Sequence, residues 1–144
     1  MVSRLIVCIF ILQGCFSPKA LSPEDALRDY ISYRFSSGQT REKHLELTTG
    51  ELKAKVESLT EEQFKSYSNT SIYNLKNIKV VLKSCTANAC SITYILSYNK
   101  PGNGTDLTEV KKIAELEQIE GSWKVKEVST VKTYFESDKP IDVP

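Results

Sequence analysis

Residues 78–98 read IKVVLKSCTANACSITYILSY and contain two alternating segments joined by a short turn. The apolar positions of the first segment are Ile78, Val80 and Leu82. Those of the second segment are Ile92, Tyr94, Leu96 and Tyr98. Recurrence at every second position is typical of a strand with one buried face. We therefore predict an antiparallel hairpin with its turn at residues 86–89.

A cysteine stands at the inner end of each segment, Cys85 before the turn and Cys90 after it. Residues that face each other in an antiparallel pair lie about 4.5–5.5 Å apart at Cα, and a disulfide spans about 4.4–6.8 Å. In an exported chain we therefore predict a Cys85–Cys90 disulfide that fixes the hairpin register. We expect no redox role, because redox pairs more often have Cys-x-x-Cys spacing at a helix start. Two free thiols are the alternative.

Two more turn signals, at residues 101–104 and 120–122, predict that the sheet continues. After the second turn, apolar residues alternate with lysines, which predicts a last strand with Trp123 in the core. Residues 107–119 are ambiguous, because their apolar residues also recur every three positions, as on a helix. The flanking turns favour a strand there, since a helix would separate strands that need partners.

The residues before the sheet show helical patterns. Ser22 can cap a helix whose first position is Pro23. The apolar stripe of this helix consists of Leu27, Tyr30, Ile31 and Phe35. Gly38 is expected to stop it, which predicts a helix over residues 22–37. Shorter helices are predicted over residues 40–48, over residues 51–58 and from Thr60 onwards, where Thr60 and Gln63 can form a capping box.

Helices followed by antiparallel strands predict an α+β fold. We expect N-terminal helices packed on a curved antiparallel sheet of about four strands, in the shape of a cone. Three motifs carry a resemblance to a known family: SPEDA at residues 22–26, LTTGEL at 47–52 and GSWKV at 121–125. They resemble the small lipoprotein members of the superfamily built like nuclear transport factor 2 and ketosteroid isomerase. This resemblance implies a cone that often has an apolar pocket at its mouth, but no single function.

The first residues resemble a bacterial lipoprotein signal. Arg4 precedes an apolar run, and residues 12–15, Leu-Gln-Gly-Cys, are similar to a lipobox. The resemblance implies cleavage before Cys15, with acyl chains such as palmitate anchoring Cys15 to a membrane. We expect a bacterial envelope protein facing the periplasm, and Phe16 favours the outer over the inner membrane. A buried strand is the alternative for the apolar run.

These features divide the chain into four parts. We expect a signal peptide at 1–14, a lipidated tether at 15–21, one α+β domain at 22–136 and a flexible tail at 137–144. The sequence has 19 basic and 18 acidic side chains, and loss of Arg4 with the signal leaves 18 of each. A net charge of zero gives no electrostatic basis for nucleic-acid binding.

The candidate site residues are aromatic rather than metal-binding. His44 is the sole histidine, and we expect it at the surface, with no metal site and no cofactor. A possible pocket is formed by Tyr30, Tyr33, Tyr94, Tyr98 and Trp123. Isomerases of the superfamily that the chain resembles pair a carboxylate base with a tyrosine, and Glu115 or Glu127 faces inward in one register. We favour tyrosines that belong to the core and rim.

Two functions follow. The first is a membrane-anchored, non-catalytic module that binds a small apolar ligand or another envelope protein. The second is an isomerase- or hydrolase-like enzyme that uses tyrosines and a buried Glu in the pocket of the cone. The absence of a second imidazole, of a metal-ligand set and of an acid on the inward face of the Ile92–Tyr98 segment favours the first.

Overall fold

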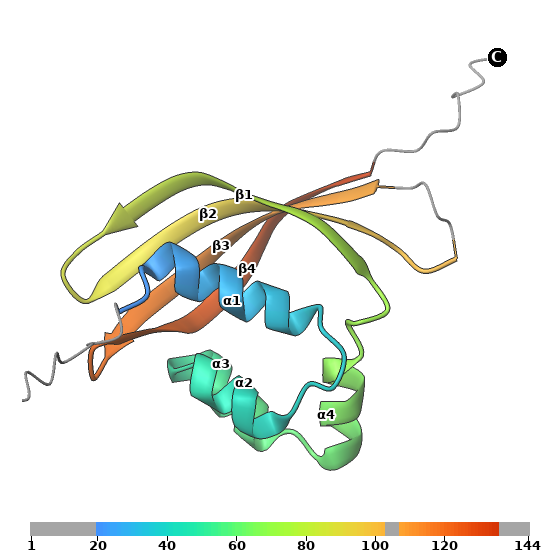
Figure 1. Ribbon diagram of the computed structural model, residues 1–144, viewed down its shortest axis with the longest axis horizontal. Helices are drawn as coiled ribbons and strands as arrows, with labels where there is room; N and C mark the ends of the chain where they lie inside the picture. The colour runs from blue at the N-terminus through green and yellow to red at the C-terminus, as the bar shows by residue number, and fades with distance from the viewer. Residues whose placement is uncertain (1–19, 103–106, 136–144) are drawn as a thin grey trace, which may run out of the picture.

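The computed structural model describes residues 20–102 and 107–135. In these residues four helices precede a four-stranded antiparallel sheet, which confirms the predicted α+β fold (Figure 1). The helices are α1 (Pro23–Arg34), α2 (Arg41–Leu47), α3 (Gly50–Ser58) and α4 (Glu61–Ser68). The strands are β1 (Asn74–Cys85), β2 (Ala89–Asn99), β3 (Leu107–Ile119) and β4 (Ser122–Phe135). The ambiguous segment is therefore the strand β3.

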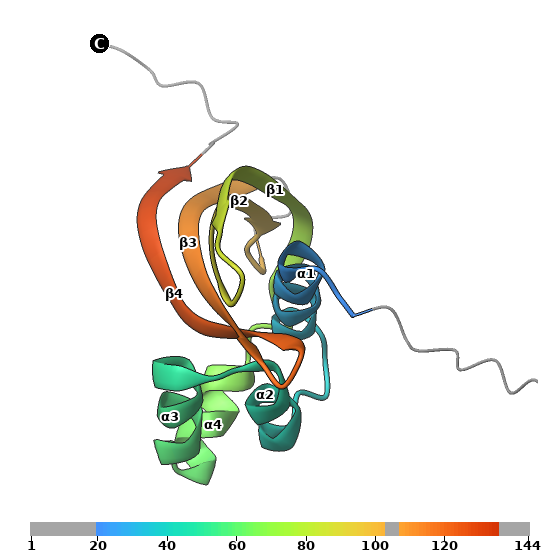
Figure 2. The same cartoon turned by 90° about the vertical axis from the view of Figure 1, so that its left-hand side faces the viewer.

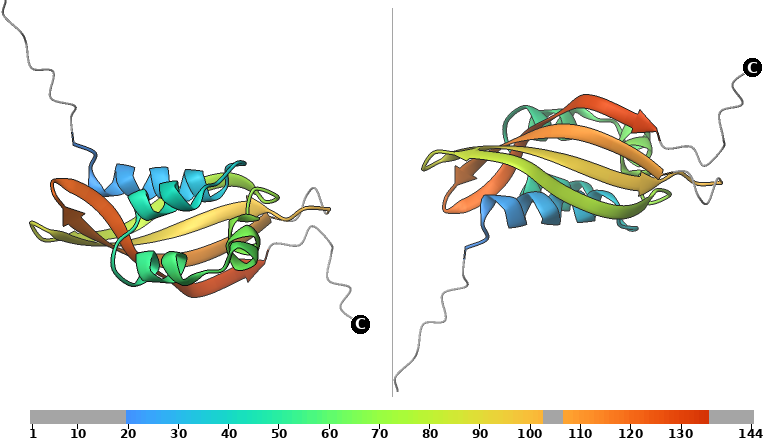
Figure 3. Two further views of the ribbon diagram at one scale, coloured as in Figure 1. Left: turned by 90° about the horizontal axis from the view of Figure 1, so that it is seen from below. Right: turned by 90° about the horizontal axis from the view of Figure 1, so that it is seen from above.

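The sheet is a meander with the strand order β1-β2-β3-β4. It is curved but unclosed, and Figure 2 shows its strands bent in an arc beside α1. The pairing register shifts in β1 between Val80 and Leu82, and in the β3–β4 pair next to Lys111 and Glu115. Because such bulges bend a strand and increase its twist, they help to give the sheet one concave face. The helices all lie on one side of the sheet (Figure 3).

The core lies between α1 and the concave face of the sheet. Leu27 and Ile31 of α1 pack in one buried cluster with the inward residues of β2, of which Ile92 is fully buried. Ala114, Leu116 and Val125 extend this cluster across β3 and β4. The helical stripe therefore meets the alternating apolar residues of β2 as expected. Leu82, which was predicted on the same buried face as Ile78 and Val80, is instead 64% exposed, because the register of β1 shifts between Val80 and Leu82.

Helix α1 begins as predicted but ends earlier. The Ser22 hydroxyl accepts a hydrogen bond from the Asp25 backbone N–H at 3.1 Å. The predicted end at residue 37 is wrong, because the helix stops at Arg34. The Arg34 carbonyl accepts hydrogen bonds from the Gln39 side-chain amide, at 2.8 Å, and from the Thr70 hydroxyl. Side chains from outside the helix thus satisfy its last carbonyl, which the local sequence does not reveal.

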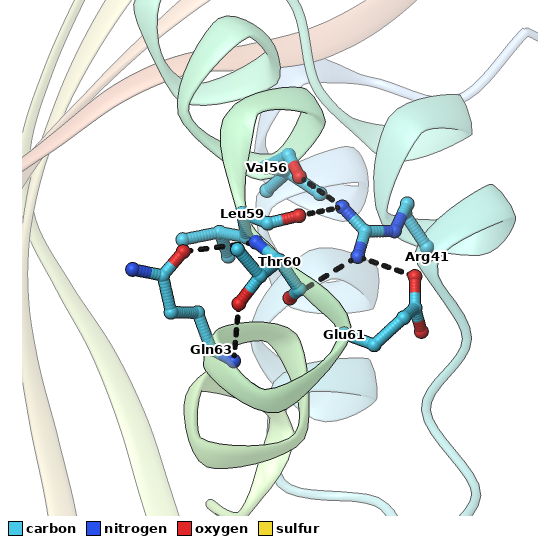
Figure 4. A network of polar contacts seen from close by, with 6 residues as sticks. All are labelled: Arg41, Val56, Leu59, Thr60, Glu61 and Gln63. Atoms are coloured by element: carbon cyan, nitrogen blue, oxygen red, sulfur yellow. Dashed lines mark hydrogen bonds and ion pairs between the residues drawn. The ribbon is translucent and has the colours of Figure 1, made fainter.

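The short helices α2, α3 and α4 are fixed by polar contacts of Arg41 (Figure 4). Its guanidinium donates to the Val56 carbonyl at 2.9 Å and to the Leu59 carbonyl at 2.7 Å, and it pairs with Glu61. These contacts satisfy carbonyls at the end of α3, where a helix leaves them without partners. The predicted capping box of Thr60 and Gln63 starts α4.

The first hairpin contains the predicted disulfide, whereas the last hairpin places Trp123 differently from the prediction. Cys85 and Cys90 are paired in register and joined by a disulfide. Trp123 was expected in the core, but it is only half-buried and packs against the edge of the core cluster. It lies next to the β3–β4 turn, opposite Gln118.

Candidate functional site

A pocket of about 370 Å³ opens between α1 and the concave face of the sheet. Its apolar lining consists of Ile31, Phe35, Leu52, Leu96 and Val128. Its phenolic lining consists of Tyr30, Tyr67, Tyr73, Tyr94 and Tyr98. Arg34, Thr70 and Lys112 complete it. The pocket is therefore largely apolar and aromatic, with two cationic side chains among the described residues that line it.

Secondary structure explains why these side chains converge. Tyr30 and Arg34 are four residues apart on α1, so they lie on one side of the helix. Tyr94 and Tyr98 have the same parity on β2 and point to the concave face. Lys112 of β3 lies directly opposite Tyr94, which brings its long side chain to the same face.

Arg34 is held by Tyr67 of α4. Its guanidinium donates to the Tyr67 carbonyl at 3.0 Å, and the guanidinium carbon lies 3.9 Å from the centre of the Tyr67 ring. A cation over an aromatic face is favourable. Neither contact supplies a negative charge, so the charge of Arg34 is oriented but not neutralised.

Lys112 donates a hydrogen bond to the Thr130 hydroxyl at 3.1 Å. Burial, and then the charge of Arg34, lower the pKa of Lys112 below the usual lysine value. Among the described residues, neither Lys112 nor Arg34 belongs to an ion pair.

Three of the phenols that line the pocket have raised pKa values. Burial raises the pKa of Tyr30, and the neighbouring Tyr67 raises it further. Burial also raises the pKa of Tyr94, and burial followed by Tyr73 raises that of Tyr98. A neutral phenol can donate and accept hydrogen bonds, so these groups offer the pocket polar contacts without charge.

The structure brings together three of the five aromatic residues proposed from the sequence, namely Tyr30, Tyr94 and Tyr98. Tyr33 lies elsewhere, because its hydroxyl accepts a 2.6 Å hydrogen bond from the Thr40 backbone N–H and its ring contacts His44. Trp123 also lies outside the residues that line the pocket.

Arg34 and Lys112 were not predicted from the sequence as site residues. Arg34 could have been found from its spacing of one helical turn after Tyr30. Lys112 lies two residues from each of the inward residues Val110 and Ala114, so it points to the same face of β3. This spacing predicts the direction of Lys112 only if residues 107–119 form a strand.

Two acids considered for catalysis face away from the pocket. Glu115 accepts a hydrogen bond from the Ser91 hydroxyl at 2.8 Å, on the convex face of the sheet. Glu127 is its cross-strand partner and is exposed. None of the described residues that line the pocket is an aspartate or a glutamate.

His44 was expected at the surface, but it is completely buried. Its ring packs edge-on against Tyr33, Phe64 and Tyr67. Nε2 lies 2.8 Å from the Gln39 side-chain oxygen, whereas Nδ1 has no partner among the described residues. Burial, with a smaller effect of Arg34, lowers the pKa of His44 to about 4. His44 is therefore a neutral core residue behind the pocket.

In the described part of the chain, no three His, Cys, Asp or Glu side chains are placed to hold a metal ion. None of the helices in residues 20–102 and 107–135 is both long and apolar enough to cross a membrane.

No protein-family model and no curated protein matches the chain in sequence. Solved structures do share its fold. A SEC-C motif containing protein from Rhodopseudomonas palustris matches with a TM-score of 0.57 and 15% identity, over 77% of this chain and 80% of that one. The intermembrane space region of the chloroplast protein ARC6 matches with a TM-score of 0.54 and 11% identity, over 75% and 92%.

A further solved structure is an Ntf2-like, potential transfer protein, TraM, from the Gram-positive conjugative plasmid pIP501. It matches with a TM-score of 0.43 and 15% identity, over 79% of this chain and 92% of that one. At identities of 15% and 11%, the similarities to the first two structures concern the fold and not the activity.

Proposed function

We propose that this chain is a lipid-anchored bacterial envelope protein whose domain binds a small, largely apolar ligand without catalysing a reaction. The observation that carries the proposal is the pocket between α1 and the sheet. Its volume of about 370 Å³ lies in the range of about 300–1,000 Å³ that is common for small-molecule sites. Its apolar walls with a few convergent polar groups are also typical of such sites.

The properties of the pocket favour binding over the enzymatic alternative. General acid–base catalysis works best with a group whose pKa lies near the working pH. The pKa values of Tyr30 and Tyr94 are instead raised, chiefly by burial. The buried Glu that the isomerase- or hydrolase-like alternative requires has no counterpart in Glu115 or Glu127, which lie on the other face.

The anchor is proposed from the sequence, because Cys15 lies outside the described residues. The lipobox-like residues 12–15 support cleavage and acylation, and two or more acyl chains would anchor the protein stably. A tether of residues 15–21 would hold the domain close to the membrane surface, with the outer membrane favoured by Phe16.

A second candidate, the binding of another envelope protein, is favoured by the edge strand β1. Val81 is 49% exposed and Leu82 is 64% exposed on this strand. An unpaired edge with exposed apolar side chains can pair with a partner strand.

Native mass spectrometry of the protein extracted from its own membranes tests the proposal. We expect a chain that begins at Cys15, carries the mass of its acyl chains and retains a non-covalently bound small molecule. A chain that retains residues 1–14 would contradict the anchor. A ligand-free chain that is bound to a second protein would contradict the small-molecule role and favour the edge-strand alternative.

A further inference from the structure

Two cationic side chains lie in one partly enclosed pocket, and neither has an anionic partner among the described residues. Arg34 reaches the pocket from α1 and Lys112 reaches it from β3. The ion pairs of the described residues all join side chains of the helices, and none includes Arg34 or Lys112. The pocket therefore has a positive charge that the described part of the protein leaves uncompensated.

The contacts that hold the two cations are neutral. Arg34 is bound to the carbonyl and the ring of Tyr67, and Lys112 is bound to the Thr130 hydroxyl. Like charges that approach each other between low-dielectric walls repel more strongly than in water. A cleft of this kind also concentrates the field and attracts ions of opposite charge. An anion between the two side chains would relieve the repulsion.

A buried phenol adds a hydrogen-bond donor beside the cations. Tyr94 is 1% exposed and lies opposite Lys112. Its hydroxyl makes no hydrogen bond to a described residue, and because Tyr94 lines the pocket, a ligand there can reach this hydroxyl. A ligand oxygen at this place could accept from Tyr94 and from the two cations together, and hydrogen bonds of this charge-assisted kind are the strong ones.

We infer that the pocket binds an anionic amphiphile, with its oxyanion head group between Arg34 and Lys112 and its apolar body against Phe35, Leu96 and Val128. The head group is a carboxylate or another small oxyanion. This inference rests on the proposed binding function and specifies its ligand class. An uncharged apolar ligand would cover these two half-buried cations without supplying a counter-charge, which is costly.

Photolabelling of the full chain in membranes with two matched probes tests this inference. One probe is 4-(trifluoromethyl-diazirinyl)benzoate, and the other is the corresponding benzamide, which has the same shape without the charge. Labelled peptides are identified by mass spectrometry. We expect the benzoate to label peptides that line the pocket at least about tenfold more than the benzamide, the ratio that one charge-assisted hydrogen bond gives.

Substitutions at two neighbouring lysines distinguish an effect of charge in the pocket from an effect of the net charge of the protein. Lys112→Met should reduce benzoate labelling of the pocket about tenfold, while Lys112→Arg should retain it. Lys111→Met is the matched control, because Lys111 is next in sequence and lies on the opposite face of β3. It should label like the wild type. Since Lys112 makes only one side-chain hydrogen bond to a described residue, its loss should not prevent folding.

Competitors distinguish an amphiphile from a free anion. Unlabelled decanoate should abolish benzoate labelling of the pocket, whereas inorganic phosphate at the same concentration should not. If inorganic phosphate competes with the benzoate and decanoate does not, the inference that the ligand is an amphiphile is wrong. Equal labelling of the pocket by the benzoate and the benzamide would contradict the inference that the head group is anionic, but it would leave the proposed binding function intact. Labelling by neither probe would contradict both.

Discussion

Lys112 of β3 lies directly opposite Tyr94 of β2, and both side chains line the pocket under α1. A lysine on the concave face of a sheet interrupts an otherwise apolar surface, since its strand neighbours on that face, Val110 and Ala114, are buried. Lys112 itself is half-buried at the pocket, and because lysine is uncommon on a face that packs against a core, the proposed binding function gives a reason for its position.

Tyr94→Phe should leave the free energy of unfolding unchanged or slightly higher, while it weakens ligand binding. The substitution removes a hydroxyl that makes no hydrogen bond to a described residue. Tyr33→Phe is the matched control, because it removes a 2.6 Å hydrogen bond to the Thr40 backbone N–H and should cost about 1 kcal/mol. Urea unfolding measures both. A loss above about 1 kcal/mol in Tyr94→Phe would show that its hydroxyl stabilises the fold.

Stability should fall in acid through His44. Its pKa in the folded protein is about 4, below the ordinary histidine pKa of 6.5, so the unfolded chain binds the proton more readily. The stabilising contribution is complete above pH 6.5 and is lost as the pH falls toward 4. The slope of this contribution should approach about 1.4 kcal/mol per pH unit.

His44→Phe should remove this part of the pH dependence, because phenylalanine fits among Tyr33, Phe64 and Tyr67 without a titrating group. Urea unfolding of the wild type and the variant, at intervals between pH 7 and pH 4, gives the difference. Parallel stability curves for the two proteins would contradict the assignment.

Trp123→Ala should destabilise the domain less than Leu27→Ala. Leu27 is fully buried, and truncation of such a core residue costs about 2–5 kcal/mol. Trp123 is half-buried at the edge of the core, so less surface loses its contacts. Thermal and urea unfolding of both variants give the order, and a larger loss in Trp123→Ala would place that side chain in the core after all.

The Cys85–Cys90 disulfide should leave mature, unreduced protein without a reactive thiol after denaturation, since Cys15 is expected to be acylated. Cys85→Ala should cost about 2 kcal/mol, because the closed loop is short. Titration with a thiol reagent in denaturant checks the pairing. Two reactive thiols per chain would show that the cysteines are free and would weaken the case for export.

Local patterns predicted most of the fold, and tertiary contacts account for what was missed. The caps at Ser22 and Thr60 and the alternation in β2 depend on neighbouring residues, so the sequence reveals them. The end of α1 depends on Thr70, which lies far along the chain. The burial of His44 likewise depends on Phe64 and Tyr67 of another helix.

The contrast between local patterns and tertiary contacts also explains which residues of the candidate site were predicted. Tyr30, Tyr94 and Tyr98 were predictable, because they belong to apolar faces that a helix and a strand must bury together. Lys112 was not, because it is polar and its direction depends on whether residues 107–119 form a strand. Its spacing from Tyr30 places Arg34 on the same side of α1, but the contacts that orient its guanidinium come from Tyr67, which is distant in sequence.

The most direct test of the binding pocket compares two substitutions on one strand. Val128→Trp fills the pocket, whereas Val131→Trp places the same side chain on β4 at a position that is 53% exposed and does not line the pocket. Circular dichroism melting first establishes that both variants fold. Native mass spectrometry of membrane-extracted protein then measures the bound small molecule per chain. We predict that Val131→Trp retains the ligand and that Val128→Trp loses it; equal retention by the two folded variants would contradict the pocket as the functional site.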